Sequence, residues 1–166
     1  GSRILLHWSA AYTPPQLAVL PASGGEARRL TDTRTAAFRA REWIQPQYVQ
    51  VPSTHGAGAI WAKLYKPAAF EPGRKYPVVM FVHGAGYLQN VSARYPNYFR
   101  EQMFNNMLVQ QGYVVLDMDY RASEGYGRDW RNAIYERMGT PELEDYIDGV
   151  NWMVANAQGD AANVGI

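Results

Sequence analysis

Apolar and polar positions along the chain predict buried strands that alternate with helices in its second half. Val78 to Val82 is a nearly continuous apolar run rich in β-branched residues, which is typical of a strand buried on both faces of a parallel sheet. We predict that this run is the central strand. Residues 113–118 have the same character and predict a second buried strand, and residues 163–166 begin a third.

Ahead of the central strand, short segments punctuated by Gly and Pro predict antiparallel strand pairs. The first group is a meander of residues 4–8 and 17–20, with a turn at 11–15 and a polar return at 26–31. Residues 32–41 are small and polar, which indicates a linker or an exposed crossover. The second group is a hairpin of residues 48–51 and 59–65.

Helical periodicity follows the central strand. In residues 98–111 the apolar positions of one helical face are Phe99, Met103, Phe104, Met107 and Leu108. Gly112 suits the residue just after this helix, and residues 128–138 predict a second, short helix. This order of strands and helices predicts an α/β fold with right-handed crossovers.

The last predicted helix has the clearest start signal. Thr140 suits the N-cap and Pro141 the first helical position, and acidic residues follow in the first turn. Its predicted core stripe is Leu143, Tyr146, Ile147, Val150, Met153 and Val154.

Composition narrows the classes of function. The chain has 166 residues, which is long enough to bury a core. Its formal net charge of +1 does not indicate binding to nucleic acid or to an anionic membrane. No run of apolar residues is long enough to span a bilayer. Cysteine is absent, so disulfides and thiol chemistry are excluded, while the cellular compartment stays open.

The central strand ends in His83-Gly84-Ala85-Gly86, and this motif is the leading candidate for chemistry. A buried strand that ends in H-G-x-G resembles the place where α/β-hydrolases position an oxyanion-hole N–H. Gly84 is therefore a candidate donor to a developing oxyanion. Alternatively, Gly84 is needed only for the turn. A nucleotide-binding loop is the weaker alternative, because its third glycine would fall at position 89, which is Gln.

Other polar residues have a structural interpretation. Ser123 has a glycine two residues later, but Arg121 stands where a nucleophile elbow needs another glycine, so we predict a structural loop. His83 is predicted to orient the glycine loop rather than act as a general base. Asp117 and Asp119 would share a strand face, and we predict an Asp119–Arg121 ion pair that braces the loop. No spacing of His and carboxylates suits a metal site.

Several segments together resemble the prolyl oligopeptidase family of serine peptidases, in its dipeptidyl peptidase IV-like branch. They are residues 76–86 (YPVVMFVHGAG), 119–130 (DYRASEGYGRDW), 142–145 (ELED), 163–166 (NVGI) and, more weakly, 24–31 (GGEARRLT). The resemblance implies that residues 1–42 are the end of a β-propeller with a linker. It also implies that residues 43–166 are the N-terminal part of an α/β-hydrolase peptidase domain. Family members more often carry R-G-S where this chain has Arg121-Ala122-Ser123.

The resemblance implies a serine-type peptidase that cleaves oligopeptides by acyl transfer without a metal or organic cofactor. Its serine, acid and histidine would lie beyond Ile166, so residues 1–166 would hold none of them and be inactive alone. Some relatives use a tyrosine hydroxyl from the glycine loop, which makes Tyr87 a lesser oxyanion candidate. A carboxylic-ester hydrolase and a non-catalytic interaction domain on the same scaffold remain alternatives.

The predicted partners are a peptide substrate and, at uncovered sheet edges, a further chain. The strand at 163–166 and the meander at 4–30 would expose unpaired edges, which invite pairing with a second copy or a partner protein.

Overall fold

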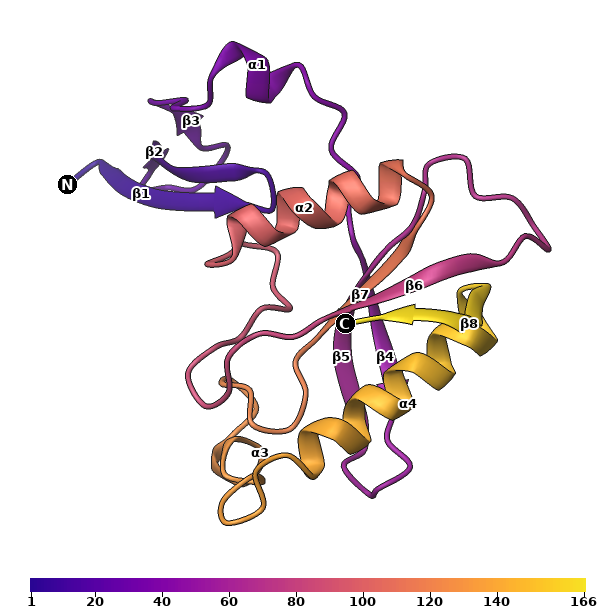
Figure 1. Ribbon diagram of the computed structural model, residues 1–166. Coiled ribbons are helices and arrows are strands. Elements are labelled where there is room, and N and C mark those ends of the chain that lie inside the picture. The colour runs from indigo at the N-terminus through magenta and orange to yellow at the C-terminus, as the bar shows by residue number, and fades with distance from the viewer. The chain divides into compact units, whose positions relative to one another are not determined.

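The computed structural model describes all residues 1–166, which form two compact units. The first unit comprises residues 1–43 and 92–99, and the second comprises residues 44–91 and 100–166. The first unit contains an antiparallel sheet in the order β1-β2-β3, made of β1 (Arg3–Ala10), β2 (Thr13–Pro21) and β3 (Arg28–Arg29) (Figure 1).

Two predictions for the first unit need correction. The turn between β1 and β2 is only Ala11–Tyr12, because Pro14 and Pro15 belong to β2 at an irregular point of the pairing, where proline costs no ladder hydrogen bond. The predicted linker contains the short helix α1 (Ala36–Arg39), whose first turn is capped by Thr35, the acceptor of a 3.1 Å hydrogen bond from Phe38 N.

The second unit is built on a five-stranded sheet in the order β4-β5-β7-β6-β8, which confirms the α/β class. The strands are β4 (Gln47–Pro52), β5 (Ala59–Tyr65), β6 (Tyr76–Phe81), β7 (Val114–Met118) and β8 (Gly159–Gly165). β4, β5 and β7 pair antiparallel, whereas β6 lies parallel to both β7 and β8.

The strand predicted to be central is displaced by one position. β7 occupies the middle of the sheet and is buried along its whole length, while β6 lies beside it with alternating buried and half-buried residues. β6 also ends at Phe81, so Val82 is outside the strand and half exposed. The last strand begins at Gly159, earlier than predicted.

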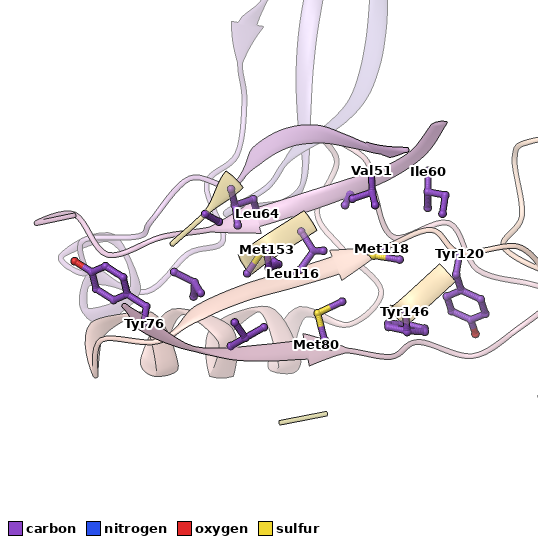
Figure 2. Close-up of a cluster of buried hydrophobic side chains, with 14 of the residues drawn as sticks. Val51, Ile60, Leu64, Tyr76, Met80, Leu116, Met118, Tyr120, Tyr146 and Met153 are labelled. Atoms are coloured by element: carbon purple, nitrogen blue, oxygen red, sulfur yellow. The ribbon is translucent and has the colours of Figure 1, made fainter. Parts of the chain in front are cut away.

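Helix α4 (Pro141–Asn156) packs on the sheet through Tyr146 and Met153, as predicted (Figure 2). Gly149 allows this approach, because a Cβ there would lie 2.5 Å from Met118 Sδ. The predicted stripe is wrong at Leu143 and Ile147, which are 58% and 50% exposed. The helix buries a face that includes Asp145 and Asp148 instead.

The start of α4 also differs from the prediction. The Thr140 side chain makes no capping hydrogen bond. The Glu142 carboxylate instead accepts hydrogen bonds from Gly139 N, at 2.9 and 3.1 Å.

Helix α2 (Phe99–Gln110) buries several polar residues, and its predicted apolar face is wrong at Phe104 and Met107, whereas the predicted Leu108 is partly buried against the core. Phe104 and Met107 are about half exposed, whereas the helix buries Gln102, Asn105, Asn106 and Val109. The reason is that the facing groups are hydrogen-bond donors. Tyr65 OH donates to Gln102 Oε1 at 3.2 Å and Ile44 N donates to Asn106 Oδ1 at 2.8 Å.

The end of α2 agrees with the prediction, whereas the end of α3 does not. Gly112 follows α2 with a φ of 88°, and Tyr113 N donates to Leu108 O at 3.1 Å, which confirms the glycine stop. The helix predicted over 128–138 is only α3 (Arg128–Arg131), and turns complete the segment.

Candidate functional site

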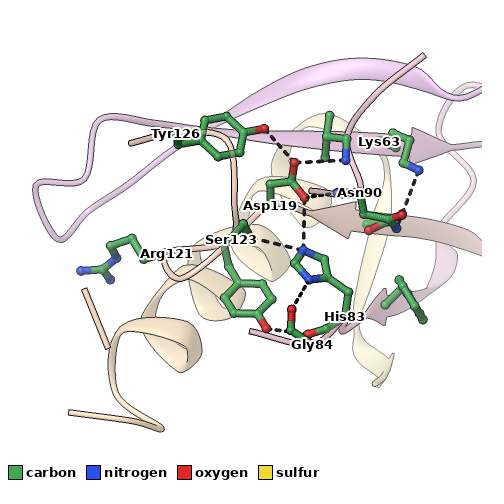
Figure 3. Close-up of polar contacts among 12 residues, drawn as sticks. Lys63, His83, Gly84, Asn90, Asp119, Arg121, Ser123 and Tyr126 are labelled. Carbon is green, nitrogen blue, oxygen red and sulfur yellow. Dashed lines mark hydrogen bonds and ion pairs between the residues drawn. The ribbon is translucent and has the colours of Figure 1, made fainter. Parts of the chain in front are cut away.

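The carboxyl ends of β6 and β7 lie at the same edge of the sheet, because the two strands are parallel neighbours. Two loops leave this edge. The first starts after β6 and carries His83 and Gly84, and the second, residues 119–127, follows β7. In open α/β sheets this edge is where ligands bind. Figure 3 shows side chains from both loops turned toward one another.

His83 is buried, and both of its ring nitrogens face acceptors. Nδ1 donates to the Gly84 carbonyl at 2.8 Å, and Nε2 lies 3.1 Å from Asp119 Oδ1. Burial opposes the charged imidazolium. The hydrogen bonds to Asp119 and Gly84 and the charges of Asp119 and Asp117 outweigh burial and raise the pKa of His83 above its ordinary value. The predicted role of His83 in orienting the glycine loop therefore has a structural basis.

Asp119 is fully buried and both of its carboxylate oxygens are used. Oδ1 accepts from Asn90 N at 2.7 Å as well as from His83, and Oδ2 accepts from Val91 N at 3.1 Å and Tyr126 OH at 2.8 Å. Burial, together with the charge of Asp119 and the hydrogen bond to it, raises the pKa of Tyr126, so this phenol stays protonated and keeps donating.

A second carboxylate, Asp117, lies beside this cluster on β7. Lys63 is its direct cross-strand partner on β5, with Nζ 3.2 Å from Asp117 Oδ2, and the Asn90 amide donates to the same oxygen. Asp117 and Asp119 thus face the same segment, as their spacing predicted. The sequence did not predict that Lys63, Asn90 and Tyr126 belong to this cluster. For Lys63 a signal was available, because a lysine between apolar residues of a predicted strand indicates a buried charge that needs a partner.

Ser123 resembles a nucleophile by its neighbours, but its geometry is wrong for one. It is fully buried, and its Oγ lies 3.2 Å from His83 Nε2. In a catalytic triad the serine and the acid contact opposite ring nitrogens. Here Asp119 and Ser123 share Nε2, while Nδ1 serves a backbone carbonyl. This arrangement agrees with the structural role predicted for Ser123.

The predicted Asp119–Arg121 ion pair is wrong. Arg121 pairs with α4 instead, where its guanidinium lies 2.8 Å from Asp145 and 2.7 Å from Glu144, and its backbone N donates to Asp145. The chain turns directly after β7, so the two side chains leave in different directions, and Figure 3 shows Arg121 directed away from Asp119. Arg121 still braces the loop, but against the helix.

Ala122 has a φ of 106°, which glycine adopts easily and alanine does not. The residue is fully buried and its backbone is fixed on both sides, since Ala122 O accepts from Gly86 N at 2.6 Å and Ala122 N donates to Trp130 O at 3.0 Å. The loop therefore keeps a glycine-like shape at the position where the resemblance leads one to expect glycine.

A hollow of about 630 Å³ opens beside the glycine loop. Its lining residues are Gly86, Tyr87, Arg131, Asn132, Ile134, Tyr135, Glu136 and Met138. The Tyr87 side chain is 77% exposed, and the Arg131 guanidinium lies 5.1 Å from the centre of its ring. A second hollow of about 490 Å³ shares Arg131 and Asn132 with the first. Hollows with aromatic side chains and a few polar groups are typical of ligand sites.

Two further properties bear on the class of site. The structure contains no group of three or more His, Cys, Asp or Glu side chains that could hold a metal ion. None of its helices is both long enough and apolar enough to cross a membrane.

Comparison with known proteins adds a family relationship. A family model described as prolyl oligopeptidase family matches residues 98–166. Dipeptidyl peptidase 8 of Homo sapiens is 33% identical over 116 residues, which cover 69% of this chain and 12% of that protein.

Solved structures give the same relationship at the level of the fold. Dipeptidyl peptidase 4 of Porphyromonas gingivalis superposes with a TM-score of 0.80 at 28% identity, over 99% of this chain and 23% of that one. Acylaminoacyl peptidase of Pyrococcus horikoshii superposes with a TM-score of 0.73 at 25% identity, over 100% of this chain and 26% of that one. The second unit is thus similar to an α/β-hydrolase domain, and the chain spans about a quarter or less of these proteins.

Proposed function

Because the chain belongs to the prolyl oligopeptidase family, we propose that it forms part of a serine peptidase that cleaves oligopeptides by acyl transfer. In this proposal residues 1–166 supply one side of the active site. The serine, acid and histidine of the triad come from residues after Ile166, and β1 to β3 belong to the end of a β-propeller.

We assign Gly84 to the oxyanion hole. It is exposed and lies three residues after the end of β6, at the edge where β7 also ends. Without a Cβ, Gly84 lets a substrate carbonyl approach its N–H closely. The position of this exposed glycine, beyond the strand and directly after the buried His83, is the observation that carries the proposal.

The hollow beside Tyr87 is the proposed place of the peptide. Tyr87, Tyr135 and Met138 are each more than 70% exposed and line the same hollow, so apolar surface is available to a substrate side chain. The Arg131 guanidinium in the wall can donate to a backbone carbonyl.

The decisive experiment replaces the amide between His83 and Gly84 with an ester, that is, the backbone N–H of Gly84 with oxygen, in the complete protein. One oxyanion donor contributes mainly in the transition state, so we expect kcat to fall about a hundredfold or more with little change in KM. An ester at Gly56, which is exposed in the hairpin loop after β4, is the matched control. A Gly84 ester that folds and keeps kcat within a few-fold would refute the assignment, and Tyr87→Phe would then test the tyrosine hydroxyl.

Matched peptide and ester substrates separate the proposal from its alternatives. We expect hydrolysis of peptides and labelling by a fluorophosphonate probe at a serine other than Ser123. Hydrolysis of esters alone would identify a carboxylic-ester hydrolase, and the absence of both hydrolysis and labelling would favour a non-catalytic interaction domain.

A further inference from the structure

We infer that Asp119 is a positioning residue, which holds the glycine loop in the shape that presents Gly84. The inference rests on the proposed function for its catalytic consequence. Its structural basis is separate and comes from the contacts of one buried carboxylate.

Asp119 holds the loop at two points that are far apart along it. At the start of the loop, Oδ1 contacts His83 Nε2 at 3.1 Å. Seven residues later, the carboxylate accepts from the backbone N–H groups of Asn90 and Val91, at 2.7 and 3.1 Å. Residues 84–89 between these points therefore form a closed loop, with both of its ends fixed to the same side chain.

The position of Asp119 explains why a single side chain can do this. It directly follows the last residue of β7, the neighbour of β6 in the sheet, and its backbone N donates to Trp61 O on β5 at 2.9 Å. The carboxylate is thus attached at the end of the central strand of the sheet, which is buried along its whole length. Groups held by a rigid scaffold can keep a catalytic donor within the small tolerance that catalysis requires.

Only one side chain, that of His83, links Asp119 to Gly84. His83 Nε2 contacts Asp119, and His83 Nδ1 donates to the carbonyl of Gly84 itself at 2.8 Å. The His83 carbonyl in turn accepts a hydrogen bond from Tyr120 OH. The two peptide groups next to Gly84 are therefore held by the imidazole ring and by Tyr120, and the ring is held by Asp119.

Tyr126 connects the loop after β7 to the same carboxylate. Its hydroxyl donates to Asp119 Oδ2 at 2.8 Å, and its neighbours Gly125 and Gly127 line the second hollow. Four donors converge on Asp119, and a neutral amide cannot serve all four, because its NH2 group would face donors. Asp119→Asn is therefore a nearly isosteric change that disrupts the contacts without creating a cavity.

The test uses Asp119→Asn in the complete protein, with Asp148→Asn as the matched control. Asp148 is also a buried aspartate that holds a loop by its backbone, since it accepts from Thr54 N at 2.8 Å and Thr54 Oγ1 at 2.7 Å, but that loop joins β4 and β5. The measurements are kcat and KM for a peptide substrate, and amide hydrogen exchange of residues 84–91 in the free protein.

We expect Asp119→Asn to lower kcat at least tenfold with KM changed less than threefold, and to speed exchange in residues 84–91 at least tenfold. Asp148→Asn should leave both readouts within twofold of the parent. Parental kcat and exchange in Asp119→Asn, or equal losses in both variants, would overturn the inference. If the parent hydrolyses no peptide, the proposed function fails, and hydrogen exchange alone decides the role of Asp119.

Tyr126→Phe provides a second route if Asp119→Asn does not fold. It removes one donor to Oδ2 and leaves the carboxylate and both loops in place. We expect exchange at Asn90 and Val91 to rise several-fold, because their shared acceptor is then less firmly held. Unchanged exchange at these two amides would overturn the inference.

Discussion

Two buried aspartates hold loops at the same edge of the sheet, and they do so with different chemistry. Asp119 accepts from two backbone N–H groups, a tyrosine and His83, whereas Asp145 accepts from the backbone and the guanidinium of Arg121. Both carboxylates are fully buried. The difference lies in the cation, since histidine changes its charge near neutral pH and arginine does not.

The comparison shows how the start of the loop after β7, which contains Asp119 and Arg121, is fixed from two sides. Burial opposes the charge of Arg121, but its hydrogen bonds to Asp145 and Glu144 raise its pKa further, so its attachment to α4 is present at every working pH. The His83–Asp119 contact depends on protonation. We therefore expect a permanent brace on the helix side and a pH-dependent one on the side of the glycine loop.

The largest predicted effect comes from breaking the permanent brace. Arg121→Met leaves Asp145 buried without its cation, which should lower the free energy of unfolding by about 3 to 5 kcal/mol. Urea denaturation followed by tryptophan fluorescence measures this. Arg128→Met is the control, because Arg128 and its partner Asp129 are both more than 80% exposed and screened by solvent. Equal losses in the two variants would show that Asp145 does not depend on Arg121.

The pH-dependent brace predicts a smaller effect with a definite sign. The folded pKa of His83 is raised above its unfolded value, so its contribution is fully present below about pH 6.5 and is lost as the pH rises through the folded pKa. The free energy of unfolding should therefore fall as the pH rises above about 6.5. His83→Gln should lack this component, which the difference between the two denaturation series isolates. Identical pH dependence in both proteins would contradict the prediction.

Ala122 directly follows Arg121, and its replacement by glycine is predicted to increase stability. Ala122→Gly relieves an unfavourable φ but makes the unfolded chain more flexible, so we expect a net stabilisation of about 0.5 to 1 kcal/mol. Thermal or urea denaturation provides the measurement. Ala155→Gly, on the exposed face of α4, should instead destabilise the protein. A loss of stability in both variants would mean that Ala122 is not strained.

The smallest predicted effect on activity concerns Ser123. Removal of its buried hydroxyl in Ser123→Ala should cost about 1 kcal/mol of stability, because one polar contact to His83 is lost. In the complete protein kcat should stay within a few-fold of the parent and fluorophosphonate labelling should persist. Loss of labelling in this variant would make Ser123 the nucleophile, against its geometry.

The α/β class, nearly all of the strands of the sheet and the place of the glycine loop were predictable from the sequence. These features depend on local signals, namely apolar runs, glycine and proline stops, and the H-G-x-G motif at the end of β6. The helix faces were less predictable. α2 buries Gln102 and Asn106 because donors from Tyr65 and Ile44 face them, and no periodicity within the helix contains that information.

The pairing of the buried charges could not be predicted from the sequence, because it depends on how the elements pack together. Asp119 and Arg121 are two residues apart, yet one reaches back to the loop after β6 and the other reaches forward to α4. The partners on other elements lie 23 to 36 residues away in sequence, and their directions depend on the turn after β7 and on strand order. A buried charge is stable only beside a suitable partner, and strand order together with helix placement determines which partner is within reach.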